Sequence, residues 1–147
     1  VVALVEFGIT LILFIGLMFF FRMSINTSIL VSPLIVLCVL IFSSAMAFIL
    51  GAATVKNRDL NHIIPFLVNF GIWFTPVFYP VSIIPQQYLK WLYFNPMAGF
   101  IELFRWSMGL QQSFNSYCFI SVLVSLVLLL ISLLYFIKTE DSIADKI

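Results

Sequence analysis

The chain is 147 residues long, and 63% of these residues are hydrophobic while only 9% are charged. Soluble domains carry about 25% charged residues, so this composition, with a mean hydropathy of +1.19, indicates an integral membrane protein. The formal net charge is +1 and the seven Lys and Arg form no basic stripe, so the sequence gives no reason to expect nucleic acid as a partner.

The first predicted membrane span covers about residues 1–21. It holds a single charged residue, Glu6, and at a rise of about 1.5 Å per residue it can cross the roughly 30 Å hydrocarbon layer. Three phenylalanines followed by Arg22 are typical of an interfacial end. Because the chain begins at Val1 almost inside this span, without the basic segment of a signal peptide, we expect an N-terminally truncated fragment.

The second predicted span covers residues 29–55 and contains no charge. Ser44, Ala47, Gly51 and Thr54 recur at intervals of three and four, which places small side chains on one helix face. Membrane helices associate through such faces because small residues allow close backbone approach. We therefore expect this face to pack against another span, within the chain or across a dimer.

A polar loop follows the second span, and its central residues are Lys56, Asn57, Arg58 and Asp59. Its two basic residues lie close to two membrane ends, which favours the cytoplasmic side by the positive-inside rule. An ordinary solvated turn is the alternative interpretation. The single histidine, His62, cannot form a metal site alone, so we expect it to make a hydrogen bond at the interface.

The third predicted span covers residues 63–79, with Pro65 near its start and Pro76 near its end. Its far half carries four aromatic side chains, Trp73, Phe74, Phe78 and Tyr79. Two interpretations remain open for these rings: an aromatic belt at the water interface, or a path on which an amphipathic solute such as a sugar could stack. From the residues alone, the belt is the favoured interpretation.

Residues 80–116 are apolar but too often interrupted by proline to cross the membrane twice. Residues 86–94 predict a helix in the interface, Asn95-Pro96 predicts a turn, and residues 97–108 predict a second short helix. Broken backbone at membrane depth is tolerated only where it is buried in protein or lines a wet cavity. We therefore predict a re-entrant or interfacial helical hairpin.

The second helix of this hairpin contains Glu102 and Arg105, which are three residues apart. This spacing allows the two side chains to pair along one face of the helix. Charged groups at membrane depth are costly in lipid, so these two should face protein or water. Both are therefore candidates for a functional role.

The last predicted span covers residues 117–137, which carry no charge, and a polar tail follows it. Ser121 and Ser125 form a small-xxx-small pair that predicts a helix contact. The sequence as a whole predicts an all-α membrane protein. Its single transmembrane domain, residues 1–147, would contain four transmembrane helices and a re-entrant or interfacial helical hairpin before the last span.

Motifs of enzymatic chemistry are missing from the sequence. It has no GxxxxGK[ST] loop for nucleotide phosphates, no HExxH or CxxC metal motif and no GxSxG nucleophile elbow. We therefore expect no catalytic, cofactor-binding or metal-ligating residues in this chain.

Several landmarks occur in a fixed order between Gly51 and Gly109. They are Asn57-Arg58-Asp59, the run FTPVFYP at residues 74–80, Pro85, Phe94-Asn95-Pro96, and Glu102 with Phe104-Arg105. In this order and with these separations they resemble the membrane permease of ABC-2 type exporters, especially those that move O-antigen, capsular polysaccharide or teichoic acid. The resemblance extends over most of the chain and corresponds to the C-terminal four of that family's six spans.

The resemblance implies a multi-pass permease in the bacterial cytoplasmic (inner) membrane that functions as a homodimer with two ATP-binding cassette subunits. ATP would be bound by those subunits, so this chain would be a transport subunit without a cofactor, and its cargo would be a lipid-linked polysaccharide. The loop of Lys56, Asn57, Arg58 and Asp59 would contact the ATPase. Residues 80–116 would form the outward re-entrant region, which includes Pro80, Pro85, Asn95, Pro96, Glu102 and Arg105, while Trp73, Phe74, Phe78 and Tyr79 become candidates for channel lining.

Three alternatives stay open at this point. The nearest is an ABC-2 exporter of drugs or small lipids. A membrane enzyme of lipid-linked sugar biosynthesis is a different class, and it would need catalytic groups clustered at one interface, where only Glu102 and Arg105 come close. The third is a non-catalytic subunit of the same assembly machinery.

Overall fold

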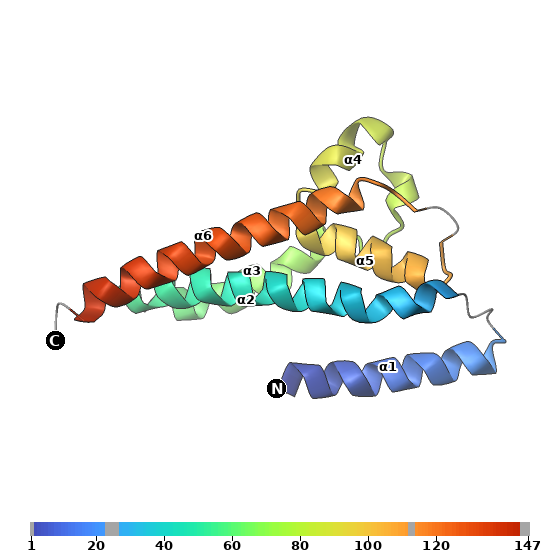
Figure 1. The fold of residues 1–147 in the computed structure, drawn as a ribbon, viewed down its shortest axis with the longest axis horizontal. Helices are drawn as coiled ribbons and strands as arrows, with labels where there is room; N and C mark the ends of the chain where they lie inside the picture. The colour runs from blue at the N-terminus through green and yellow to red at the C-terminus, as the bar shows by residue number, and fades with distance from the viewer. Residues whose placement is uncertain (1, 23–26, 112–113, 145–147) are drawn as a thin grey trace.

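The computed structural model describes residues 2–22, 27–111 and 114–144, and within these ranges the chain is helical without strands. Figure 1 shows long helices side by side and a group of short helices on one flank. The α-helices are α1 (Val2–Phe20), α2 (Ser32–Lys56), α3 (Leu60–Gly71), α4 (Gln86–Leu92), α5 (Pro96–Ser107) and α6 (Cys118–Ala144), and the 3₁₀ helices are η1 (Thr27–Val31), η2 (Ile72–Phe74) and η3 (Val81–Ile83). The predicted all-α class is confirmed for the described residues.

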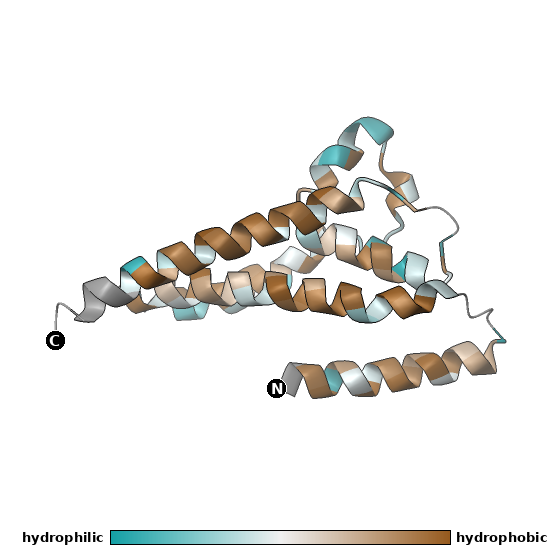
Figure 2. Cartoon of the chain, viewed as in Figure 1, coloured by the Kyte–Doolittle hydropathy of each residue, from teal (hydrophilic) through white to brown (hydrophobic). Residues whose placement is uncertain are grey.

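Two helical stretches in the described part of the chain, Thr27–Val55 and Cys118–Thr139, are long and apolar enough to cross a membrane. They correspond to the spans predicted at 29–55 and 117–137. The apolar stretches of the other two predicted spans, Leu4–Phe20 and Leu60–Phe74, are shorter. Figure 2 shows strongly hydrophobic residues over most of α6 and over the first half of α2, while the second half of α2 is less hydrophobic.

The helix predicted over residues 63–79 ends earlier than predicted. α3 continues as η2 only to Phe74, and Thr75 then adopts an extended backbone with φ −114° and ψ 137°. The cause is Pro76, because a proline ring clashes with a helical residue before it and has no amide hydrogen to donate. Trp73 and Phe74 therefore lie on the helical part, while Phe78 and Tyr79 lie on the irregular segment beyond it.

The largest helix contact joins α2 and α6. Ala45 and Ala52 of α2 are buried, and so are Ser125 and Ser132 of α6. The two serine hydroxyls donate to backbone carbonyls of their own helix, at 2.7 Å each, so their burial leaves no hydroxyl unsatisfied. Small side chains thus bring the two helix backbones close together.

Of the two helix contacts predicted from small residues, one is confirmed within this chain and the other is not. The pair Ser121 and Ser125 is buried, which confirms the predicted helix contact. On α2, by contrast, Ala47 and Gly51 are exposed, and α2 packs through Ala45 and Ala52 instead. Within this chain, the small face predicted on α2 is therefore not the packing face.

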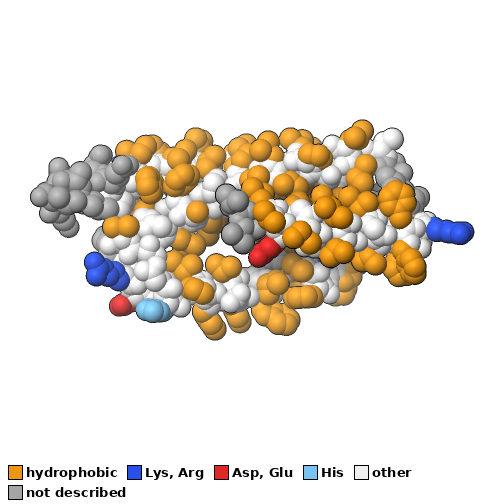
Figure 3. Space-filling view, turned by 90° about the horizontal axis from the view of Figure 1, so that it is seen from below, with side chains coloured by type: hydrophobic (Ala, Val, Ile, Leu, Met, Phe, Trp, Pro, Cys, Tyr) orange, Lys and Arg blue, Asp and Glu red, His pale blue; other side chains and the backbone are white. Residues whose placement is uncertain are grey.

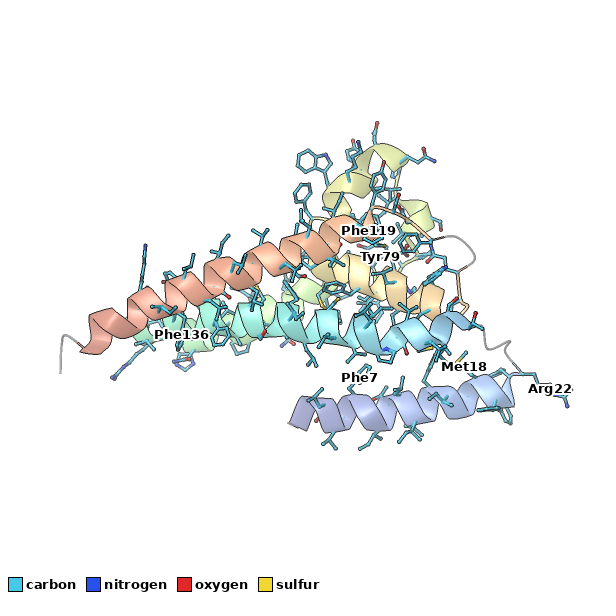
Figure 4. The ribbon with its side chains drawn as sticks, in the orientation of Figure 1. Phe7, Met18, Arg22, Tyr79, Phe119 and Phe136 are labelled. Atoms are coloured by element: carbon cyan, nitrogen blue, oxygen red, sulfur yellow. The ribbon has the colours of Figure 1, made fainter. Side chains whose placement is uncertain are left out.

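The ends of the helices gather at two opposite ends of the molecule (Figure 1). The end of α2, the start of α3 and the end of α6 lie together at one end. The end of α1, with Arg22 labelled in Figure 4, and the start of α2 lie at the other. α5 packs against α6, α2 and η1, so the short helices are held against the half of the molecule that contains Arg22.

Gly99 sets the distance between α5 and α6. A Cβ atom added there would overlap the Ser121 side chain, and it would lie 3.5 Å from the Tyr93 ring. Ser121 is completely buried and its hydroxyl donates to the Tyr93 carbonyl at 2.8 Å, so it cannot simply turn away. The position requires glycine because of this close helix approach.

Gly99→Ala should therefore destabilise the protein by about 1–3 kcal/mol, the range for overpacking a tight contact. The measurement is thermal unfolding of the purified protein in detergent. Gly51→Ala is the matched control, because nothing lies within 4 Å of a Cβ at Gly51. Adding Ser121→Gly should recover part of the loss, and equal stability of the two alanine variants would contradict this contact.

Candidate functional site

The segment from Gly71 to Pro85 is the break in the helical chain that the prolines predict. Pro76, Pro80 and Pro85 have no amide hydrogen, so the regular ladder of backbone hydrogen bonds cannot continue through them. Backbone carbonyls in this segment must find other donors, because an unpaired carbonyl is costly away from water. The structure shows where these donors come from.

Arg105 of α5 supplies two of the donors. Its Nη2 donates to the Val77 carbonyl at 2.9 Å, and its Nη1 donates to the Tyr79 carbonyl at 3.4 Å. The planar guanidinium presents several donors in one fork, which suits two carbonyls that are close together. Arg105 therefore holds the irregular segment against α5.

Asn95 and Thr75 supply the others. The Asn95 Nδ2 donates to the Phe74 carbonyl at 3.3 Å, and the Thr75 hydroxyl donates to the Gly71 carbonyl at 2.8 Å. Asn95 also caps α5, because its Oδ1 accepts a hydrogen bond from the Met97 amide at 3.2 Å. The predicted turn at Asn95-Pro96 is thus the point where α5 starts and where the end of η2 is attached to it.

A buried polar cluster is centred on Glu102 of α5. The Glu102 Oε2 accepts hydrogen bonds from the Tyr93 hydroxyl at 3.2 Å and from the Gln111 Nε2 at 3.1 Å. Asn115 donates to the Tyr93 hydroxyl at 3.2 Å. Tyr93 and Glu102 are 0% and 4% exposed, so this carboxylate is compensated by donors inside the protein. The cluster joins the end of α4 to α5 and to the segment before α6.

Burial and the neighbouring Glu102 carboxylate raise the pKa of the Tyr93 hydroxyl. The hydroxyl therefore keeps its proton and acts as a donor to Glu102. Gln111 reaches the same carboxylate because α5 ends in a glycine turn. Gly109 has φ 74°, and the Leu110 amide donates to the Arg105 carbonyl at 3.0 Å, which reverses the chain.

The predicted pairing of Glu102 with Arg105 is wrong. Glu102 binds Tyr93 and Gln111, and Arg105 binds the carbonyls of the irregular segment. The three-residue spacing puts both side chains on neighbouring parts of α5, but each makes its hydrogen bonds with residues outside α5. The guanidinium donates to the carbonyls of the irregular segment, and the carboxylate accepts from Tyr93 and Gln111.

The predicted aromatic residues lie on the outside of the chain. Trp73, Phe74 and Phe78 are 67%, 65% and 69% exposed, and Tyr79 is half-buried. Phe74 extends the rings of Phe66 and Phe70 along α3, with its centroid 5.6 Å from that of Phe70, and Trp73 and Phe78 form a second pair with centroids 5.8 Å apart. We call Phe66, Phe70, Phe74, Trp73 and Phe78 the aromatic row.

The loop of Lys56, Asn57, Arg58 and Asp59 connects α2 to α3. Lys56 ends α2, and the Asn57 amide caps it by donating to the Ala53 carbonyl at 3.0 Å. Arg58, Asp59 and His62 are exposed, and Figure 3 shows basic, acidic and histidine side chains together at one end of the molecule. The loop thus lies at the end of the molecule opposite to α4 and α5.

The remaining candidates, Pro80 and Pro85, flank η3. Both have an extended backbone, and each precedes a short helix, η3 or α4. Gln112 and Ser113, within the predicted region of residues 80–116, lie outside the described residues. In the ranges that the structure describes, no three His, Cys, Asp or Glu side chains lie close enough to hold a metal ion.

Sequence reasoning missed a pocket of about 540 Å³ between α1, α2 and α5. Its lining is apolar except for Ser43 and Arg105. No pattern within one helix predicts it, because three helices contribute to it. The sequence signal is that apolar Ile101 lies four residues before Arg105 and so shares its face of the helix.

Comparison with known proteins gives two similarities. The family described as ABC-2 type transporter matches residues 1–109. The O-antigen export system permease protein RfbA of Myxococcus xanthus is 36% identical over 75 residues, which are 50% of this chain and 29% of that protein. The aligned part of this chain thus spans less than a third of the length of that relative.

Asn95 allows its two roles to be separated. Asn95→Asp keeps the oxygen that caps α5 but removes the Nδ2 donor to Phe74, whereas Asn95→Ala removes both. We expect Asn95→Ala to cost about 1–3 kcal/mol and Asn95→Asp to cost less, since only one hydrogen bond is lost. Thermal unfolding in detergent measures both, and a cost for aspartate as large as that for alanine would show that the Phe74 bond, not the cap, dominates.

Proposed function

This chain belongs to the ABC-2 type transporter family, and we propose that it is the membrane permease of an ATP-driven exporter that moves lipid-linked polysaccharide across the bacterial cytoplasmic membrane. The proposed cargo is of the O-antigen, capsule or teichoic acid type. The observation that carries this choice is the aromatic row, considered together with the O-antigen export permease to which the chain is similar.

The aromatic row suits a polymer of sugars. Exposed ring faces offer broad apolar contact with a polar edge, and a sugar ring can slide from one to the next without being fixed. A drug or small lipid is usually bound in an enclosed site that buries most of its surface, whereas these rings are exposed along α3. The row therefore favours a polysaccharide over the nearest alternative.

The proposed topology has four spans with the hairpin entering from the outer side. α3 and η2 together cover Leu60–Phe74, about 22 Å at about 1.5 Å per residue, which falls short of the roughly 30 Å hydrocarbon layer. The extended residues after Phe74 would cover the remaining depth. The carbonyls of Phe74, Val77 and Tyr79 accept hydrogen bonds from Asn95 and Arg105, which supports placing this irregular backbone in a membrane.

The proposed assembly is a homodimer of this permease with two ATP-binding cassette subunits on the cytoplasmic side. The contact would be made by Lys56, Asn57, Arg58 and Asp59, because this loop lies at the end of the molecule away from the hairpin. ATP would be bound only by the partner subunits. The exposed charges of Arg58 and Asp59 provide side chains for recognition.

In the proposed mechanism, nucleotide binding moves the loop and the motion reaches the outer half through helix packing. α2 begins next to η1 and ends at the loop, and it packs along α6. The hairpin follows α6, because the Glu102 cluster and the Gly99 contact join them. A shift of the loop would therefore displace the hairpin and the aromatic row relative to the second permease copy, and open a path between them.

The topology predicts opposite labelling of two single cysteines. In a variant without Cys38 and Cys118, Arg58→Cys should react with a membrane-impermeant maleimide only from the cytoplasmic side, and Lys90→Cys only from the outside. Both positions are exposed in this chain, and the permease is labelled without its ATPase, so lack of reaction would report the membrane barrier and not burial. Reaction of both positions from the same side would disprove the four-span topology.

The loop assignment predicts uncoupling. Arg58→Ala combined with Asp59→Ala should lower export of surface polysaccharide by at least about tenfold, the effect of losing about 1.4 kcal/mol of contact, while membrane insertion stays normal. Asn61→Ala, an exposed neighbour in the first turn of α3, is the control. The same strains show whether an ATPase copurifies with the permease; normal export by the double variant would reject the loop assignment, and the absence of any copurifying ATPase would reject the exporter.

A further inference from the structure

One face of α3 and its continuation η2 carries polar and aromatic side chains in turn. His62, Phe66, Asn69 and Trp73 follow one another at intervals of four, three and four residues, so they lie along one face of the helix. All four are exposed in this chain, Phe66 by 66% and Trp73 by 67%. We call these four residues the α3 ladder. Its two rings belong to the aromatic row, and its two polar side chains alternate with them.

Asn69 lies near the middle of the bilayer in the proposed four-span topology. It comes nine residues after Leu60, where α3 starts, which is roughly 14 Å at about 1.5 Å per residue, compared with about 15 Å for half of the hydrocarbon layer. Its side-chain amide makes no hydrogen bond to any residue that the structure describes. An amide without a partner is costly in hydrocarbon, so Asn69 must face water or a polar group from outside this chain.

The opposite face of α3 differs in both composition and burial. It carries Leu60, Ile64, Leu67 and Gly71, which repeat the same spacing and are all apolar. Three of these, all except Leu67, are half-buried within the chain. α3 therefore turns its apolar face toward the rest of the chain and its ladder outward, although a helix surrounded by lipid would have the apolar face outside.

The size of the ladder's rings argues against a closely packed helix as the neighbour of Asn69. Membrane helices approach one another closely where small residues meet, and polar side chains then hydrogen-bond across the contact. Asn69 instead has Phe66 three residues before it and Trp73 four residues after it, and both rings stand out from the helix. These rings keep another helix away from the amide and leave room beside it for a polar solute.

We propose that the α3 ladder is a sugar-binding wall of the export path, in which Asn69 hydrogen-bonds the hydroxyl groups of the passing glycan while Phe66 and Trp73 contact its ring faces. This inference rests on the proposed export function and adds to it the residue that recognises hydroxyl groups. A sugar ring has apolar faces and a hydroxylated edge, so rings and an amide side by side match both. The Asn69 amide offers two donors and one acceptor oxygen, which suits hydroxyls in either orientation. His62 lies at the loop end of α3, which is the cytoplasmic entrance in this topology.

The test compares two single cysteines at nearly the same depth, in the full-length permease without Cys38 and Cys118. Asn69→Cys lies on the ladder, and Leu67→Cys is also exposed but lies roughly 200° around the helix. The host cells contain the partner ATPase and lack the first sugar-transfer step of polysaccharide synthesis. A small anionic methanethiosulfonate is applied from both sides, to cells and to inverted membrane vesicles. We expect Asn69→Cys to react at least about tenfold faster, because the reactive thiolate forms in water and not in lipid.

Cells that make the polysaccharide provide the second measurement. Glycan in the path should slow the modification of Asn69→Cys and leave that of Leu67→Cys unchanged. In the permease with its native cysteines, Asn69→Leu should lower export about threefold to tenfold, the effect of losing one hydrogen bond, and Asn69→Gln should retain most of the export because it keeps the amide. Leu67→Ala is the matched control and should export normally. Equal amounts of permease in the membranes of all strains exclude a folding defect.

Several results would overturn the role of the α3 ladder. They are equal reaction of the two cysteines, reaction of Asn69→Cys that glycan does not slow, and normal export by Asn69→Leu. A disulfide between the Asn69→Cys residues of two permease copies would assign this face to a contact between helices instead. Deleting the permease tests the export function separately. If surface polysaccharide then persists, the export function itself is wrong; if it disappears while the Asn69 results are negative, only the ladder is rejected.

Discussion

The structure depends on one constraint: the carbonyls of the proline-broken segment need hydrogen-bond donors that the backbone of this segment does not supply. Because prolines at 76, 80 and 85 interrupt the regular helix, the carbonyls of Phe74, Val77 and Tyr79 have no helical amide as a partner. The replacements are side chains, with Thr75, Asn95 and Arg105 donating to carbonyls between Gly71 and Tyr79. Two of these three belong to the turn before α5 and to α5 itself, so the broken segment is only stable when α5 lies against it.

α5 is in turn fixed by small residues and by one buried carboxylate. Gly99 lets it approach α6 at Ser121, and Glu102 binds donors from the end of α4 and from the chain before α6. A buried carboxylate is destabilising unless it is fully compensated, so its partners cannot be exchanged freely. The result is a hairpin that follows α6 as one unit, which the proposed transport mechanism requires.

The sequence predicted the helical class, two long apolar helices and the turn at Asn95-Pro96, because each depends on a local pattern of apolar length or turn residues. It could not predict the partners of Glu102 and Arg105. Their spacing of three suggested a pair, but the competing acceptors and donors come from Val77, Tyr79, Tyr93 and Gln111, which the spacing along α5 does not reveal. The packing face of α2 was missed for the same reason, since both of its faces carry small residues and only the position of α6 distinguishes them.

These partner choices give Arg105 a double position that neither sequence nor family resemblance indicates. One side of its guanidinium holds the carbonyls of the broken segment, and the same residue lines the pocket between α1, α2 and α5. A paired Glu102 would have neutralised Arg105 within α5 and left the carbonyls unsatisfied. With the carboxylate bound by Tyr93 and Gln111, the guanidinium is left to the carbonyls of Val77 and Tyr79. The stability of the broken segment therefore depends on keeping these two charged groups apart, although they are only three residues apart on α5.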